Sequence, residues 1–186
     1  MKVAVGTSRA RIDSSFAGLR IAIPARRNWF VILFLLAWLG GWVMGETSAI
    51  RMLASGKGEV GFMVFWLCGW TVGGAFAIGA WLWNVAGMEY ISIRNGELAH
   101  RFAVGPVGWS REYALAHVTR LRAVPTPQAA FGQRWGNNPF VPNDGTICFD
   151  YGAKTIRMGS GLDEAEARQL VDQMTSRHHG LAALPA

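Results

Sequence analysis

Two long apolar runs without charge constrain this chain more than any other feature of its sequence. They cover residues 29–45 and 60–87, and neither contains Asp, Glu, Lys or Arg. A bilayer core needs about 20 helical residues, with a range of about 17–25. A soluble helix of this length would show a polar face, and neither run has one. We therefore predict transmembrane helices at residues 29–47 and 60–87, joined by an external loop at residues 48–59.

The charges that flank the two runs predict their orientation. Arginines precede the first run and follow the second, whereas residues 46–59 hold two basic and two acidic residues. Segments rich in Lys and Arg stay in the cytoplasm, so we predict a multi-pass membrane protein with both termini cytoplasmic. The basic flank before the first run is longer than that of a signal peptide, and we expect a retained anchor.

The net charge of +6 is concentrated in the N-terminal flank. Residues 1–27 hold six basic residues and one acidic residue, while ten basic residues meet nine acidic ones from residue 88 onward. A nucleic-acid-binding domain would need a basic face, so we predict that nucleic acid is not a partner. The predicted partner of the chain is the lipid bilayer. The candidate contacts to the membrane surface are Arg20, Arg26, Arg27, Arg94 and Arg101. The alternative is that these arginines only set the topology.

Tryptophan and small residues recur in both apolar runs. Trp38 and Trp42 are spaced i,i+4, as are Trp66 and Trp70, so each pair lies on one helix face. Either these pairs pack and anchor the helices, or they form a docking face for a pigment, a quinone or a partner helix. The small residues at four-residue spacing are Ala37, Gly41 and Gly45, then Gly69 and Gly73, then Ala75 and Gly79. Such ridges allow close helix packing, within the hairpin, with a membrane-protein partner or in self-association.

The remaining residues predict a small β-rich domain closed by a helix. Residues 1–18 are polar and rich in small residues, which predicts a disordered basic N-terminus, and residues 19–24 predict a short strand that joins the domain. Asn95-Gly96 is a strong hairpin signal. Further strands are expected at residues 90–93, 97–104, 109–115, 118–124, 146–151 and 155–158.

A C-terminal amphipathic helix is expected over residues 163–177. Asp163 and Glu166 have the spacing of a capping box at its start. Its apolar face is expected to consist of Ala165, Leu170, Val171 and Met174. Residues 179–186 are expected to form a flexible tail.

A long loop is expected between two of the strands, at residues 125–145. Loops of this length in compact domains are often functional or disordered. Its aromatic residues Phe131, Trp135 and Phe140 are candidate partner contacts, together with the four tryptophans of the apolar runs.

Catalytic chemistry is not indicated. His100 and His117 have no Cys or carboxylate at ligand spacing, and Cys148 lacks a nearby base. The carboxylates Glu89, Glu112 and Asp150 are scattered and do not mark an acid–base pair. We expect no catalytic residue, no metal and no cofactor, and two free, buried thiols at Cys68 and Cys148.

Strands closed by a C-terminal helix follow the order of elements in a pleckstrin-homology-like domain. The stretches IPARRNWFVILF (residues 23–34) and FDYGAKTIRMGSGLDEAEA (residues 149–167), with the Gly- and Trp-rich second run, resemble a family of small bacterial membrane proteins. Those proteins carry a helical hairpin fused to a pleckstrin-homology-like domain. The resemblance covers roughly residues 18–178. It implies this α+β, mostly antiparallel fold for residues 88–178, an inner-membrane location and no enzyme activity.

Two functions are consistent with these patterns. The first is a non-enzymatic, membrane-anchored interaction module that stabilises or assembles an inner-membrane complex. The alternative is an adaptor that binds lipid headgroups at the cytoplasmic membrane surface. A membrane enzyme with an unrecognised site is a third reading, with no residue pattern in its favour.

Overall fold

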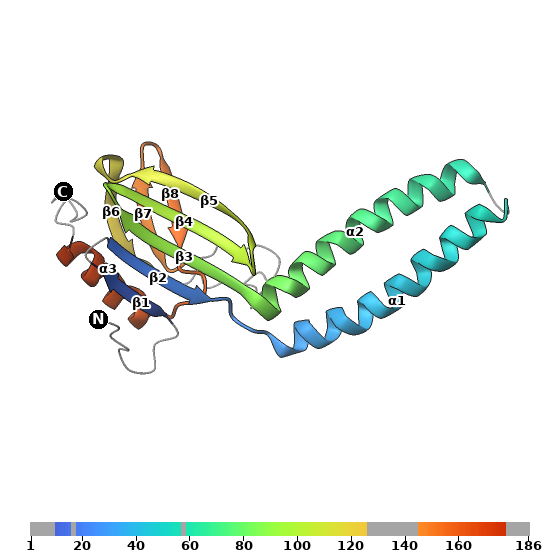
Figure 1. The fold of residues 1–186 in the computed structure, drawn as a ribbon, viewed down its shortest axis with the longest axis horizontal. Coiled ribbons are helices and arrows are strands. Elements are labelled where there is room, and N and C mark those ends of the chain that lie inside the picture. The colour runs from blue at the N-terminus through green and yellow to red at the C-terminus, as the bar shows by residue number, and fades with distance from the viewer. Residues whose placement is uncertain (1–9, 16–17, 57–58, 126–144, 178–186) are drawn as a thin grey trace. The chain divides into compact units, whose positions relative to one another are not determined.

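The computed structural model describes residues 10–15, 18–56, 59–125 and 145–177. The chain divides into two compact units, Arg27–Val85 and a second unit made of Met1–Arg26 and Ala86–Ala186. The first unit consists of two long apolar helices. The second is mostly antiparallel β-sheet and ends in a helix (Figure 1).

The helical unit contains α1 (Trp29–Ala54) and α2 (Val60–Ala86). Helix α1 continues seven residues past the predicted end at residue 47, so the expected external loop at residues 48–59 is too long. Polar side chains do not interrupt the helix here, because the Thr47 and Ser48 hydroxyls donate back to the Val43 and Met44 carbonyls. The chain breaks only at Gly56, which has a φ of +69°.

Both helices are long and apolar enough to cross a membrane. In the most apolar stretch of each helix, only 11% and 6% of the residues are buried. The buried side of α2 consists of Gly74, Ala77, Ala80 and Asn84, and Leu35 of α1 joins Ala77 and Ala80 in a small apolar cluster. A core helix of a soluble protein would bury far more of its apolar surface.

The larger sheet of the second unit has five antiparallel strands in chain order (Figure 1). These strands are β1 (Arg11–Ser15), β2 (Gly18–Pro24), β3 (Gly87–Arg94), β4 (Glu97–Val104) and β5 (Val107–Ala114). Strand β1 corrects the prediction of disorder at residues 11–15, while residues 1–9, 16 and 17 of the predicted segment lie outside the described residues. It pairs with β2 through Arg11↔Ala22 to Ser15↔Gly18, so backbone pairing at the sheet edge orders a segment whose side chains are mostly polar.

The β3–β4 hairpin confirms the turn predicted at Asn95-Gly96. Both residues have positive φ, 51° and 80°, as a two-residue type I′ turn requires. Arg94 and Glu97 are therefore paired, and the register continues to Gly87↔Val104.

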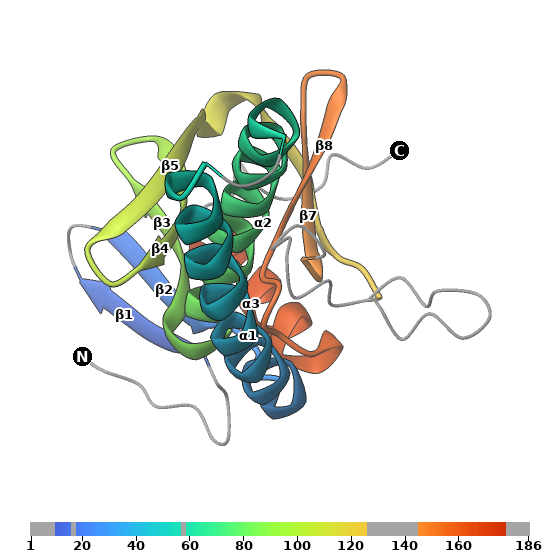
Figure 2. The ribbon, with the colours of Figure 1, turned by 90° about the vertical axis from the view of Figure 1, so that its right-hand side faces the viewer.

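The smaller sheet has the order β6-β7-β8, and Figure 2 shows its strands β7 and β8 side by side as a hairpin. Its strands are β6 (Val118–Ala123), β7 (Ile147–Tyr151) and β8 (Lys154–Met158), and a short 3-10 helix, η1 (Leu115–His117), leads into it from the larger sheet. These strands confirm the predicted ones to within a few residues at each end.

Helix α3 (Glu164–Arg177) closes the unit. The predicted capping box is present, because Asp163 Oδ1 accepts the Glu166 N–H at 2.7 Å and Glu166 Oε2 accepts the Asp163 N–H at 3.1 Å. Ala165 is exposed, however, and Ala167 is the buried alanine. The apolar face is set by the spacing from Leu170 and Met174, which places position 167 on the buried side.

One apolar core joins both sheets and α3. Strand alternation directs every second side chain of β2, β3 and β4 to the inner face of the larger sheet, whereas Tyr113 is the one buried residue of β5. The fully buried members of the core include Ile21, Ile91, Leu98, Ile147, Phe149, Ala167 and Met174.

Candidate functional site

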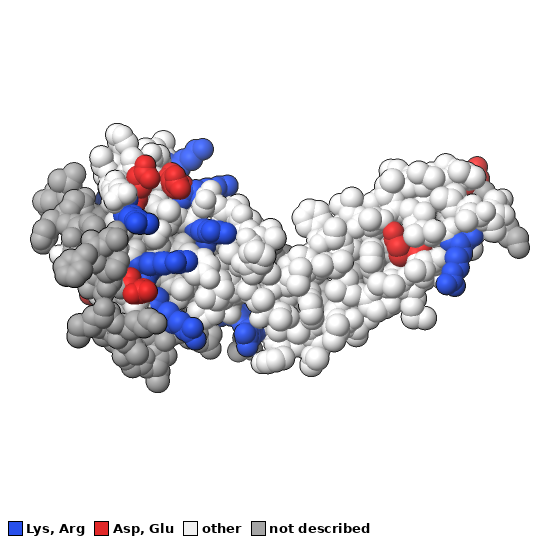
Figure 3. All heavy atoms as spheres, viewed as in Figure 1, with Lys and Arg blue, Asp and Glu red and all other residues white. Residues whose placement is uncertain are grey.

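The outer face of the five-stranded sheet carries the side chains that alternate with the core residues. Its central row runs across all five strands as Asp13, Arg20, Ser92, Ala99 and Glu112. Basic side chains interspersed with acidic ones are visible on this face (Figure 3). The face is therefore polar and mixed in charge, and its floor is built from small residues.

A groove of about 460 Å³ lies on this face. Three of the arginines predicted from the sequence line it, Arg20 from β2, Arg94 from β3 and Arg101 from β4. The other polar lining residues are Tyr90, Ser92, Ser110 and Glu112. We name this site the arginine groove.

The guanidinium groups of the arginine groove are available to a ligand. The Arg20 guanidinium lies over the Tyr90 ring, with its carbon 5.0 Å from the ring centroid, a cation–π arrangement that orients the side chain. Within the described residues, none of the three guanidinium groups forms a hydrogen bond or an ion pair. Each carries five N–H donors in a planar fork that suits carboxylate and phosphate.

The other two predicted arginines lie elsewhere. Arg26 and Arg27 are exposed in the segment between β2 and α1 and do not line the groove. The structure therefore brings together three of the five candidate surface arginines. The loop aromatics Phe131, Trp135 and Phe140 lie outside the described residues.

The four predicted tryptophans are engaged in the helical hairpin. Trp42 Nε1–H donates to the Trp70 carbonyl at 3.0 Å, and the Trp70 ring contacts the rings of Trp38 and Trp66 at 6.4 and 5.5 Å. A Cβ atom on Gly74 would lie 2.2 Å from the Trp42 ring, so glycine is required there. Packing accounts for Trp42 and Trp70, while Trp38 and Trp66 remain 38% and 49% exposed.

Most of the predicted small-residue ridges face away from the hairpin contact. A Cβ atom at Gly41, Gly69, Gly73 or Gly79 would meet no other atom within 4 Å. The contact between α1 and α2 uses Gly74, which belongs to none of the three ridges, and Gly45 of the first ridge, where a Cβ atom would lie 3.8 Å from the Trp70 ring. The exposed glycines therefore leave room for another helix.

A buried carboxylate that sequence reasoning missed lies on the inner face of β3. Glu89 Oε1 lies 2.7 Å from His100 Nε2 and accepts the Gly159 N–H at 2.6 Å. Its Oε2 accepts the N–H and the hydroxyl of Ser160, both at 2.9 Å. Both oxygens are thus fully bonded, and the carboxylate links β3 and β4 to the turn before α3.

The hairpin register contained the signal for this pair. The Asn95-Gly96 turn pairs Glu89 with Phe102 and Ile91 with His100, so Glu89 and His100 are diagonal neighbours on the core face. Each lies an even number of positions from buried residues of its own strand, Glu89 from Ile91 and His100 from Leu98, which identifies both as inward-facing. The contact with Gly159 and Ser160, about 70 residues later, has no local sequence signal.

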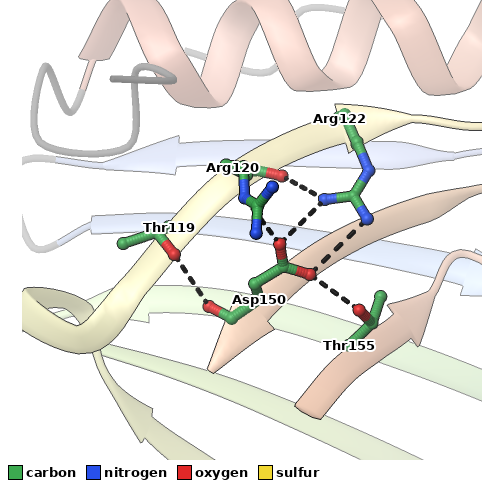
Figure 4. A network of polar contacts seen from close by, with 5 residues as sticks. All are labelled: Thr119, Arg120, Arg122, Asp150 and Thr155. Carbon is green, nitrogen blue, oxygen red and sulfur yellow. Dashed lines mark hydrogen bonds and ion pairs between the residues drawn. The ribbon is translucent and has the colours of Figure 1, made fainter. Parts of the chain in front are cut away.

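A second polar cluster surrounds Asp150 on β7 (Figure 4). The carboxylate lies 2.9 Å from Arg120 Nε and 3.3 Å from Arg122 Nη1, and the Thr155 hydroxyl donates to Oδ1 at 2.8 Å. The Thr155 hydrogen bond and the two guanidinium groups lower the pKa of Asp150. A β-bulge between Thr119 and Arg122 directs both arginines to the same carboxylate.

The two cysteines are free but differ in exposure. Cys148 is buried, and burial raises the pKa of its thiol. Cys68 is exposed on α2, which corrects the expectation of two buried thiols, because position 68 lies on the outward side of the helix. In the described part of the chain, no three His, Cys, Asp or Glu side chains group to hold a metal ion.

No protein-family model, curated protein or solved structure matches this chain.

Proposed function

We propose that the chain is a membrane-anchored, non-enzymatic interaction module of a bacterial inner membrane. The α1–α2 hairpin spans the bilayer, both termini lie in the cytoplasm, and the arginine groove binds a carboxylate-bearing segment of a partner protein. In this role the chain stabilises or assembles a larger membrane complex. The observation that carries the proposal is the convergence of Arg20, Arg94 and Arg101, from three strands, on one groove, where their guanidinium groups form no hydrogen bond or ion pair with the described residues.

The mixed charge of the groove favours a polypeptide over a lipid surface. Glu112 lines the groove, and Asp13 lies beside Arg20 in the central row. Carboxylates repel an anionic bilayer, whereas they can accept hydrogen bonds from a peptide backbone. Arginine forks on a partner's carboxylate give bidentate, oriented contacts, and the small floor residues Ser92 and Ala99 admit an extended segment.

The hairpin supports the same proposal within the membrane. Gly69 and Gly73 are exposed on α2 with open space beside them. Helices in lipid associate through close packing at such small residues. A partner helix at this ridge, or a second copy of this chain, would hold the complex together while the arginine groove selects the partner.

We also propose that the β-rich unit is pleckstrin-homology-like. The support is its order of antiparallel strands in two sheets that share one core, closed by the C-terminal helix α3.

Purification of the tagged full chain from native membranes in mild detergent tests the proposal. Wild-type chain is expected to retain a stoichiometric membrane-protein partner, identified by mass spectrometry. The double variant Arg20→Ala/Arg101→Ala is expected to lose that partner, while Lys154→Ala, on an exposed lysine of β8 outside the groove, keeps it. Equal retention in all three would contradict the role of the groove, and a partner-free wild type would contradict the interaction module itself.

A lipid-headgroup adaptor is the second candidate function, favoured by Arg26 and Arg27, which are exposed directly before α1. Basic residues next to a membrane helix attract anionic lipid, at about 1 kcal/mol each. Under this alternative, the purified chain carries anionic lipid that is released steeply by salt. Arg26→Ala/Arg27→Ala would then remove the lipid while leaving any protein partner bound.

A further inference from the structure

The β-rich unit exposes two large apolar side chains that its core does not use. Among the described residues, the exposed large hydrophobic side chains lie on α1 and α2, with two exceptions, Val107 and Trp109. Val107 is 76% exposed and Trp109 is 56% exposed. Both belong to β5, at the end that follows the Gly105-Pro106 turn.

This end of β5 lies beside the two points at which the chain connects to the helices. Gly87 directly follows Ala86, the last residue of α2, and its carbonyl accepts the Ala25 N–H at 3.0 Å. Gly87 pairs with Val104, which in turn pairs with Val107. Neighbouring strands are about 4.8 Å apart, so Val107 lies about 10 Å across the sheet from the residue that follows α2.

The aromatic neighbours of Trp109 give it a fixed support. Its ring lies 5.5 Å from the Phe102 ring, which lies 4.5 Å from the His100 ring. Phe102 and His100 are both buried, and His100 contacts the carboxylate of Glu89. One side of the indole is therefore held against the core while the other remains exposed.

We propose that this tip, made of Val104–Val107 and Trp109, is a second membrane-contact site that inserts Val107 and Trp109 into the interfacial layer of the cytoplasmic leaflet. The inference rests on the proposed transmembrane hairpin and adds a contact made by the β-rich unit. Each headgroup layer is about 5–8 Å thick, and the covalent connection at Gly87 keeps the tip within reach of it. Trp is the side chain most typical of this layer, because its ring is apolar and its N–H can hydrogen-bond.

The charge near the tip suits the same surface. Arg111 is exposed two positions after Trp109, on the same side of β5. Because Arg111 and Trp109 are two positions apart, their side chains lie on the same face of β5. Arg111 can therefore contact the lipid phosphates when the indole is inserted. The proposed binding partner of the tip is therefore the bilayer that the hairpin spans. Val107 and Trp109 supply the apolar contact, and Arg111 on the same strand supplies the basic one.

Fluorescence quenching from lipid tests this inference on the full chain. The background variant Cys68→Ser leaves only Cys148, which is buried. Single cysteines at Val107→Cys, Ala114→Cys and Phe76→Cys would carry an environment-sensitive nitrobenzoxadiazole label in phosphatidylcholine–phosphatidylglycerol vesicles, with and without doxyl-labelled lipid. Ala114 is the matched control, because it is exposed at the opposite end of β5, and Phe76, exposed on α2, reports insertion of the hairpin.

The expected result is strong quenching at Phe76, and quenching at Val107 that is several-fold greater than at Ala114. If Val107→Cys does not express, quenching of the label at Trp109→Cys provides a second measurement at the tip. Quenching at Phe76 with none at the tip would overturn the inference while leaving the transmembrane hairpin intact. No quenching at any position would overturn both, and neither outcome depends on the arginine groove.

Discussion

The two faces of the five-stranded sheet are built from alternate residues of the same strands and differ in burial. The inner face packs into the core, and the outer face is exposed to solvent. On the inner face, Ile21, Ile91 and Leu98 are at most 1% exposed. On the outer face, Arg20 and Arg101 sit beside small residues and remain open to solvent. Along β2 and β3, a change of one position therefore moves from a buried residue to one that is partly or fully exposed.

The charged groups of the two faces show the same contrast. Glu89, on the inner face, has four hydrogen-bonding contacts with His100, Gly159 and Ser160. The arginines of the groove have no hydrogen bond or ion pair within the described residues. Burying a charged group is costly unless hydrogen bonds within the protein replace those to water. An exposed charged group is hydrated and needs no partner within the protein. Stability and binding should therefore respond to different substitutions.

The largest expected effect is that of Glu89→Ala. Removal of the carboxylate leaves the buried Gly159 N–H without its acceptor and His100 without its partner, and breaking such a buried pair costs about 3–5 kcal/mol. Denaturant unfolding of the full chain in detergent should measure this loss. The control is Glu112→Ala on the outer face, which should leave stability nearly unchanged. A loss for Glu89→Ala no greater than that of the control would contradict the contrast.

Leu98→Ala should produce the next largest loss. Leu98 is 0% exposed, and truncation of a buried leucine costs about 2–5 kcal/mol through lost burial and the cavity left behind. Its neighbour on the outer face provides a matched control, since Ala99→Ser should shift stability by less than about 0.5 kcal/mol. Equal losses at positions 98 and 99 would mean that the two faces are not distinct.

Local sequence signals predicted the β3–β4 hairpin and the N-terminal cap of α3. They did not predict every strand of the five-stranded sheet. Asn95-Gly96 fixes the β3–β4 register, and Asp163 with Glu166 fixes the start of α3, because both signals act over a few residues. Strand β1 was missed because its order comes from pairing with β2 rather than from its own composition. The predicted bounds of α1 were short because Thr47 and Ser48 remain helical.

The candidate site was likewise predictable only in part. Charge alone singled out Arg20, Arg94 and Arg101 but grouped them with Arg26 and Arg27 as membrane flanks. Arg20 precedes the apolar runs and Arg94 follows them, so only the β2–β3 pairing places them at one groove. The predicted aromatic loop contacts at Phe131, Trp135 and Phe140 stay predictions.

Acid should weaken the smaller sheet through Asp150. The pKa of Asp150 is lower in the folded protein, first through the Thr155 hydrogen bond and then through Arg122 and Arg120. The stabilisation is therefore present above the unfolded pKa, about 3.9, and is lost as the pH falls through the folded value. Asp150→Asn should be less stable than wild type at pH 7 and lose less stability on acidification. Parallel unfolding curves from pH 7 to pH 3 would contradict this role.

The smallest expected effect on stability is that of Arg20→Ala/Arg101→Ala on the outer face. Neither guanidinium group contributes an ion pair within the described residues, so the free energy of unfolding should change by less than about 0.5 kcal/mol for each substitution. Unfolding measurements beside the co-purification assay would separate the two properties. A large loss of stability would show that these arginines stabilise the folded unit, which would contradict a role in binding alone.

Photo-cross-linking from the floor of the arginine groove tests the central claim most directly. A photoreactive amino acid at Ala99, in the groove, would be compared in native membranes with the same residue at Lys154, which is exposed on β8 outside the groove. The account predicts a discrete protein adduct from position 99 that disappears with Arg20→Ala/Arg101→Ala and is absent from position 154. No adduct from position 99, or the same adduct from both positions, would contradict it.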